Sequence, residues 1–251
     1  MAVEGKTIDA LSQFELKTVL GPIGNAVGFT QSTAHMLLAA GLITLLVMYG
    51  MSRRAVVPGR LQALTESTYE FVQGIVIGQV GDEGKRFFPF VFTLFMFILF
   101  GNMMGLLPYA FTYTSHIAVT FGLAAIGFVV ITVVALSIHG KKFFGYFFPE
   151  GAPRWLAPII IPVEIVSYLS RPISLSIRLF ANMVAGHVML KVFATFIVLL
   201  GGLGAVGPFV AVLPLTVNVA LVGFEILVAF LQAYVFAILT SIYLHDAVHL
   251  H

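Results

Sequence analysis

Two exceptionally long runs of apolar residues constrain the fold of this chain more than any other feature. The longer run covers residues 159–200 and the other covers 209–245. A helix of about forty residues would be about 60 Å long, which is twice the thickness of a hydrocarbon core of about 30 Å. The first helix must therefore tilt strongly in a membrane, kink at Pro162 or Pro172, or do both. Because Gly201 to Pro208 can turn the chain between the two runs, we expect a hairpin of two long, strongly tilted helices.

The composition places the whole chain in a membrane. Hydrophobic residues make up 59% of it and charged residues only 10%, whereas soluble domains average about 25% charged residues. Its mean hydropathy is +1.03. These values predict an all-α polytopic protein that forms a single domain in a lipid bilayer. The net charge of +2 is too small to suggest nucleic-acid binding, and the lack of cysteine excludes disulfides, thiolate metal sites and cysteine nucleophiles.

Three shorter runs complete the expected set of five membrane crossings. These runs cover residues 34–51, 87–107 and 117–138. Residues 58–80 mix Glu66 and Glu70 with apolar side chains, so we expect an amphipathic helix on the membrane surface or against a partner. Residues 1–30 form a lead-in without the basic and apolar regions of a cleavable signal peptide.

The distribution of basic residues predicts the orientation. All the basic residues of the loops fall after the first run, before the second or after the third, namely Arg53, Arg54, Arg60, Lys85, Arg86, Lys141, Lys142 and Arg154. The loops at 108–116 and 201–208 carry no charge. The positive-inside rule then predicts an external N-terminus and a cytoplasmic C-terminus.

Arg178 lies inside an apolar run, where an ionisable side chain costs about 2.5–3.5 kcal/mol and is functional by default. Glu164, Arg171 and Arg178 are spaced by seven residues, so they share one helix face, and Asn182 follows one turn later. His187 falls on the opposite side of this helix. The last run repeats the spacing of seven with its own polar residues, Asn218, Glu225 and Gln232. A helix with polar groups on two faces can separate two aqueous regions, with Arg178 between them.

Structural roles are possible for some of these residues. Asn218 and Gln232 could form a hydrogen-bonded seam between helices, and Glu225 could neutralise His187 or Lys191. Asn102, between Gly101 and Gly105, suits a close helix contact as well as it suits a polar pathway.

Arg178 differs because its guanidinium cannot be neutralised by deprotonation. We expect its counter-charge to lie on another chain or to be supplied transiently, and Glu164, His187 and Glu225 could relay protons through water.

Other chemistries lack their motifs. The glycines at 201–207 are not followed by the Lys and Ser or Thr of a phosphate-binding loop. His245 and His249 are spaced as a metal pair, but no HExxH pattern is present, and a cytoplasmic tail with histidines is the simpler interpretation. We therefore expect no metal, no cofactor and no active site of the chain's own.

The motif around Arg178 resembles a known family. Residues 174–183, SLSIRLFANM, followed by Ala185 and Gly186, are similar to the signature of the a subunit of F-type ATP synthases. GNMMGLLP at 101–108, LQAYVF at 231–236 and LTSIY at 239–243 resemble further motifs of that family. Some bacterial members carry Glu at His187 and His at Glu225. The exchange seen here resembles the alphaproteobacterial and mitochondrial arrangement, and it suggests that the two residues act as a pair.

The resemblance implies a proton-translocating stator in the Fo sector of a rotary ATP synthase, a non-catalytic subunit. Arg178 would then face a ring of c subunits, with Gln232 close to it. Asn182, Glu164, Asn102, Ser174 and Tyr243 would line or support two half-channels.

The implied partners are the c ring, the b and b′ subunits of the peripheral stalk, and the F1 sector through that stalk. The implied location is a bacterial inner membrane or, as an alternative, the mitochondrial inner membrane. Gly105 stands where some members carry Asp, which argues against a proton role at that position.

Two other functions remain open from the residues alone. A self-contained ion channel or secondary transporter would show internal repeats or paired broken helices, and we find no convincing repeat. A structural membrane anchor would use both polar stripes as contacts between helices, and substitutions there would then impair assembly rather than transport.

Overall fold

The structure is a computed structural model that describes residues 14, 15, 18, 28–52, 57–107, 110–148 and 154–249. Most of the 1–30 lead-in, together with Arg53 and Arg54, lies outside the described residues, as do the side chains of Lys141 and Arg154. The long helices are α2 (Gln31–Ser52), α3 (Arg60–Val80), α4 (Phe88–Gly105), α5 (Ile117–His139), α6 (Ala157–Gly201) and α7 (Gly207–Val248). Five of the described helices, all except α3, are long and apolar enough to cross a membrane. The predicted all-α polytopic class is confirmed.

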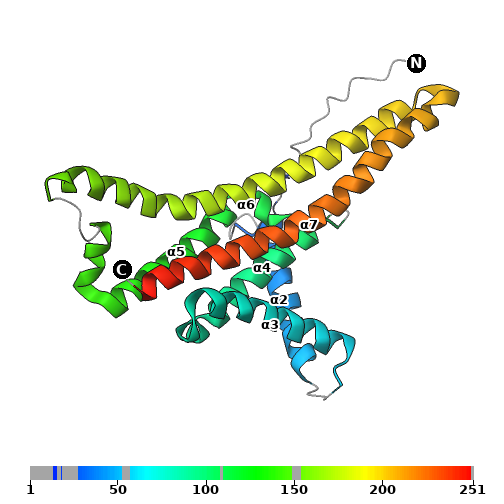
Figure 1. Ribbon diagram of the computed structural model, residues 1–251. Helices are drawn as coiled ribbons and strands as arrows, with labels where there is room; N and C mark the ends of the chain where they lie inside the picture. Colours follow the sequence, from blue (N-terminus) through cyan, green and yellow to red (C-terminus); the bar gives the residue numbers. More distant parts are fainter. Residues whose placement is uncertain are drawn as a thin grey trace.

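Helices α6 and α7 form the expected hairpin and run antiparallel past one another (Figure 1). They contain 45 and 42 residues. Pro162 and Pro172 lie inside α6 without ending it, and the helix bends gradually in Figure 1 rather than breaking at one point. The turn between the helices requires a glycine at position 207, because a Cβ there would lie 2.6 Å from the carbonyl oxygen of Leu200.

Helix α3 is amphipathic in its packing. Val72, Val76 and Val80 recur every four residues and are buried, and α3 packs against α4 and α7. Glu66 and Glu70 are exposed. The amphipathic helix is therefore present, while its location on a membrane surface stays a prediction.

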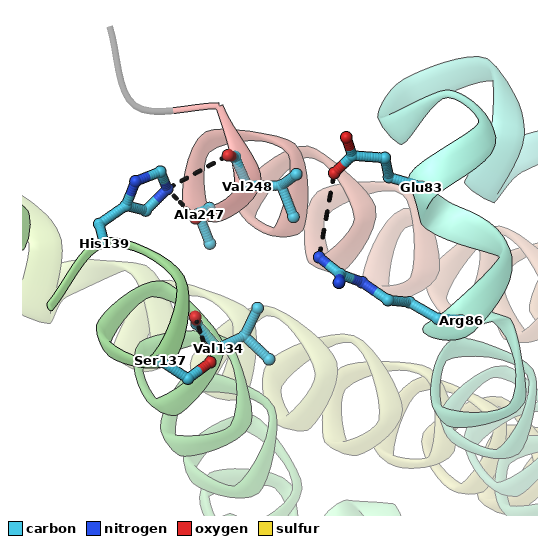
Figure 2. Close-up of polar contacts among 7 residues, drawn as sticks. All are labelled: Glu83, Arg86, Val134, Ser137, His139, Ala247 and Val248. Atoms are coloured by element: carbon cyan, nitrogen blue, oxygen red, sulfur yellow. Dashed lines mark hydrogen bonds and ion pairs between the residues drawn. The ribbon is translucent and has the colours of Figure 1, made fainter.

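Ends of different helices meet at two places in the described part of the chain. At one place the ring of His139, at the end of α5, lies 3.1 Å from the carbonyl oxygen of Ala247 and 3.2 Å from that of Val248 (Figure 2). Its N–H caps the last turn of α7. The same view includes the ion pair between Glu83 and Arg86, on the short 3₁₀ helix η2 (Asp82–Arg86) that contacts α7.

The other meeting place is the chain between α4 and α5, where residues 110–116 form what we call the 110–116 segment. It folds back onto α4, where the fully buried Tyr113 donates a hydrogen bond of 2.6 Å to the carbonyl oxygen of Phe97. Its Phe111 N–H also donates to Nε2 of His35, near the start of α2. The glycines of α4 make this close approach possible, because a Cβ on Gly101 would collide with Tyr113 and one on Gly105 with Thr112.

Candidate functional site

One face of α6 is exposed around Arg178. Ser174, Ile177, Arg178 and Ala181 are all exposed, whereas Leu179 on the inner side of the helix is fully buried. Within the part of the chain that the structure describes, Arg178 has no ion-pair partner. Arg178 is therefore a permanent cation on an exposed helix face, with no counter-charge among the described residues.

A side-chain hydrogen bond joins α6 and α7 one turn from Arg178. Nδ2 of Asn182 donates to Oε1 of Gln232 over 2.9 Å. Gln232 is 3% exposed, and its Nε2 finds no hydrogen-bond acceptor among the described residues. The two predicted polar stripes therefore meet here.

His187 and Glu225 meet at the same interface, on the side of this bond nearer the hairpin turn. Nε2 of His187 lies 3.7 Å from Oε1 of Glu225 and 2.9 Å from Oγ1 of Thr112. Glu225 is 4% exposed, and neither of its carboxyl oxygens accepts a hydrogen bond from the described residues. A Cβ on Gly186 would lie 2.7 Å from Oε1 of Glu225, so the glycine makes room for the carboxyl group. A cavity of about 310 Å³ reaches from Asn182 past Gly186 to Glu225.

Asn102 connects α4 to both neighbouring elements. Its Nδ2 donates to the carbonyl oxygen of Ala229 on α7 over 3.2 Å, and its Oδ1 accepts from Thr114 over 2.8 Å. The residue is fully buried. This geometry favours a close contact as the role of Asn102 over the lining of a polar pathway. The glycines beside it make room for the 110–116 segment rather than for another helix.

A second polar group lies at the opposite end of the α6–α7 interface. Arg171 forms an ion pair of 3.4 Å with Asp246, and its guanidinium lies 4.8 Å from the ring centre of Tyr243 and 5.4 Å from that of Tyr168. Two small cavities of about 20 and 10 Å³ border this group.

The remaining predicted residues lie outside these two groups. Glu164 is partly exposed two turns before Arg171 on α6. Asn218 is partly exposed two turns before Glu225 on α7, and its buried Oδ1 accepts no hydrogen bond from a described residue.

The sequence comparisons agree on one family. The model of the ATP synthase A chain family matches residues 33–245. The chain belongs to this family. Proteins called ATP synthase subunit a are similar to it over nearly their whole lengths. The one from Granulibacter bethesdensis is 66% identical over 100% of both chains. Those from Acidiphilium cryptum and Rhodospirillum rubrum are 58% and 49% identical, over 97% and 96% of this chain and 98% of each relative. These relatives are alphaproteobacterial, in agreement with the arrangement of His187 and Glu225.

The site of this family member contains residues that the sequence did not single out. Thr112 and Thr114 lie in the uncharged loop between α4 and α5, whose run of Thr, Tyr, Thr, Ser and His is the sequence signal that indicates a polar function. Asp246 directly follows the apolar run of residues 209–245, and nothing in the sequence indicated that it pairs with Arg171.

Proposed function

We propose that this chain is the proton-translocating stator subunit of a rotary F-type ATP synthase, with two half-channels separated by Arg178. Membership of the ATP synthase A chain family supports the general role. The single observation that carries the detailed proposal is the position of Arg178, which is exposed, has no ion-pair partner among the described residues, and lies between two polar groups of the α6–α7 interface.

The first half-channel would lead from the outer side to the c ring through the group of Glu225. A proton would pass by His187 and Glu225, enter the 310 Å³ cavity and reach a c-subunit carboxylate near Asn182. Glu225 suits this task because its carboxyl group lies beside His187 and lines the cavity.

The second half-channel would lead to the cytoplasm past Ser174 and the group of Arg171, Tyr243 and Asp246. Glu164 would lie near its exit. The hydrogen bond between Asn182 and Gln232 would separate the two paths and hold α6 and α7 in register beside Arg178.

Arg178 would act by its permanent charge. A c-subunit carboxylate is costly as an anion at a low-dielectric interface unless it is protonated or faces a cation. Arg178 would favour the deprotonated form as each carboxylate passes, and it would repel a proton moving directly between the half-channels. A proton that crosses the membrane releases about 2.3 kcal/mol for each 100 mV of membrane potential. That energy can drive rotation only if the proton crosses on the rotor, so a direct leak between the half-channels would waste it.

The proposed partners are the c ring on the Arg178 face, the b and b′ subunits of the peripheral stalk, and the F1 sector through that stalk. The chain would reside in the inner membrane of a bacterium, with its N-terminus outside and its C-terminus in the cytoplasm.

Crosslinking in native membranes tests the rotor contact directly. Because the chain has no cysteine, single cysteines at Ser174, Ile177, Arg178 and Ala181 would report one position each. All four should crosslink to a small, abundant hairpin subunit, whereas Leu179→Cys, on the buried side of the same turn, should not. Absence of these crosslinks, with ion conduction by the purified chain alone, would instead support a self-contained channel or transporter.

The charge of Arg178 is tested by substitution. Arg178→Ala should abolish ATP-driven proton pumping in inverted vesicles. Arg178→Lys should also be severely impaired, because an ammonium group can lose its proton when buried and lacks the planar fork of guanidinium. Near-normal pumping by the lysine variant would contradict the proposed role.

A further inference from the structure

The environment of His187 contains a hydroxyl group with no assigned role. Oγ1 of Thr112 lies 2.9 Å from Nε2 of His187, within hydrogen-bond distance, whereas Oε1 of Glu225 lies 3.7 Å from the same nitrogen. Thr112 is 5% exposed. The same ring nitrogen therefore faces both a hydroxyl on the 110–116 segment and a carboxyl group on α7.

The backbone and side chain of Thr112 are held firmly. Its carbonyl oxygen accepts hydrogen bonds from Oγ of Ser115 at 2.6 Å and from N–H of Ser115 at 3.2 Å. Its side chain occupies the space in front of Gly105, where any Cβ would collide with it. Thr114, two residues on, is tied to Asn102 of α4. These contacts hold the hydroxyl of Thr112 against α4, within reach of His187 on α6.

We propose that Thr112 is a positioning residue that holds His187 with Nε2 as its proton-exchanging atom, directed at Glu225. This inference rests on the proposed function. A hydroxyl is suited to the task because it can donate and accept. When His187 is neutral with its proton on Nδ1, Thr112 donates to the lone pair of Nε2. When His187 carries both protons, its Nε2–H group faces Glu225. The hydroxyl of Thr112 then turns so that an oxygen lone pair, and not its hydrogen, faces this nitrogen.

The proton transfer balances without another reactant. Imidazolium and carboxylate become neutral imidazole and carboxylic acid, so the Nε2 proton of His187 moves to Glu225 while Nδ1 keeps its own proton. The bare Nε2 then accepts the hydroxyl hydrogen bond of Thr112, which keeps the ring in place with this nitrogen beside Glu225 for the next proton. In the described helices, the ionisable neighbours of His187 are Glu225 across the interface and Lys191 one turn along α6.

The test is passive proton conduction through the assembled Fo sector in F1-stripped membranes, measured across a range of pH and normalised to the amount of this chain. Thr112→Val removes only the hydroxyl, and we expect flux to fall on the order of tenfold, since a misplaced reacting group costs up to about 10²-fold. The pH of half-maximal flux should also shift. Thr112→Ser should restore most of the flux. Thr44→Val is the matched control, because among the described residues the hydroxyl of Thr44 donates only to the carbonyl oxygen of Ala40, on its own helix.

Gly105→Ala provides an independent perturbation that displaces the hydroxyl without removing it. It should reduce flux as Thr112→Val does, and the double variant should be little worse than either single one, because both remove the same interaction. Unchanged flux in Thr112→Val, an equal loss at every pH, failure of Thr112→Ser to restore flux, or additive losses in the double variant would each overturn the proposal. Rotor crosslinks that persist in Thr112→Val leave the stator function standing, so the two proposals can fail separately.

Discussion

Gly186 shows how closely the backbone of α6 approaches the carboxyl group of α7. A methyl group at this position would lie 2.7 Å from Oε1 and 3.0 Å from Cδ of Glu225. The carboxyl group is the end of a flexible side chain, so it would move away from His187 rather than prevent packing. We predict that Gly186→Ala lowers ATP-driven proton pumping on the order of tenfold, as expected for a displaced proton-transfer group, without lowering the amount of chain in the membrane.

The control for Gly186→Ala is Gly122→Ala on α5, where nothing lies within 4 Å of the added Cβ. Both substitutions favour the helix by up to about 1 kcal/mol, so a general effect of alanine would appear in both. Equal pumping by the two variants would show that Glu225 tolerates displacement.

His116 gives the 110–116 segment a dependence on pH. Its ring stacks on Phe111 at 5.1 Å, and its buried Nε2 has no hydrogen-bond partner among the described residues. Burial holds the pKa of His116 below its ordinary value of 6.5. The unfolded chain therefore binds more protons than the folded chain near this pH, and stability is lost as pH falls.

We predict that the detergent-solubilised complex loses less thermal stability between about pH 7.5 and 5.5 when His116 is replaced by Gln. The readout is the temperature at which this chain aggregates. An identical pH dependence in both proteins would assign the effect to other groups.

Sequence spacing identified several residues of the site but not their partners. Helical spacing put Asn182 and Gln232 on the polar stripes of the two long helices, and the structure joins them by a hydrogen bond. The exchange of His187 and Glu225 suggested a pair, and the structure places the two side chains 3.7 Å apart. Thr112 could not be found in this way, because its contact depends on a loop that folds back onto two glycines of α4. Helical periodicity carries no information about such a return of the chain.

At the scale of elements, α6 and α7 are held together at the end away from their turn by Arg171 and Asp246. Their side chains are 20% and 35% exposed, so solvent screens the ion pair only in part. The guanidinium also stacks over Tyr243. We predict a coupling free energy of about 1 kcal/mol between Arg171→Gln and Asp246→Asn in a double-mutant cycle on thermal stability.

The matched pair for that cycle is Lys85 and Asp82. Their side chains are 60% and 88% exposed, and they approach to 2.7 Å. Despite this shorter distance, we expect their coupling to be close to zero, because water and salt screen both charges. A larger coupling for the exposed pair would mean that proximity outweighs burial here.

The helices themselves followed from the sequence more readily than their packing did. Apolar length alone predicted five crossings, since a membrane span needs about 20 such residues, and five described helices meet that requirement. The contacts of α3 with α4 and α7 were not predicted. An amphipathic pattern tells which face is buried, but the same valines could pack on lipid, on a partner or on this chain.

For the whole molecule, the length of α6 sets its inclination. At 1.5 Å per residue, 45 residues extend about 68 Å. If the ends of α6 lie at opposite faces of a core about 30 Å thick, its axis is inclined by about 60° to the membrane normal, well beyond the usual tilt of about 20°. Under the proposed function, such a helix would pass beside the rotor over a long arc. Arg178 would then face the rotor near the middle of that arc, with the groups of Glu225 and Arg171 on either side.

The orientation of the whole molecule is the remaining prediction, and the Cys-free chain allows a direct test. Leu203, in the α6–α7 turn, is exposed at one end of the hairpin, while Asp82 and His249 are exposed at the end where α5 and α7 terminate. A membrane-impermeant maleimide should label Leu203→Cys in intact cells permeabilised only at the outer membrane. It should label Asp82→Cys and His249→Cys only in inverted vesicles, because the basic loops keep that end cytoplasmic. The reverse pattern would place the group of Glu225 on the cytoplasmic path and exchange the entry and exit half-channels, whereas labelling of all three from one side would contradict the five crossings.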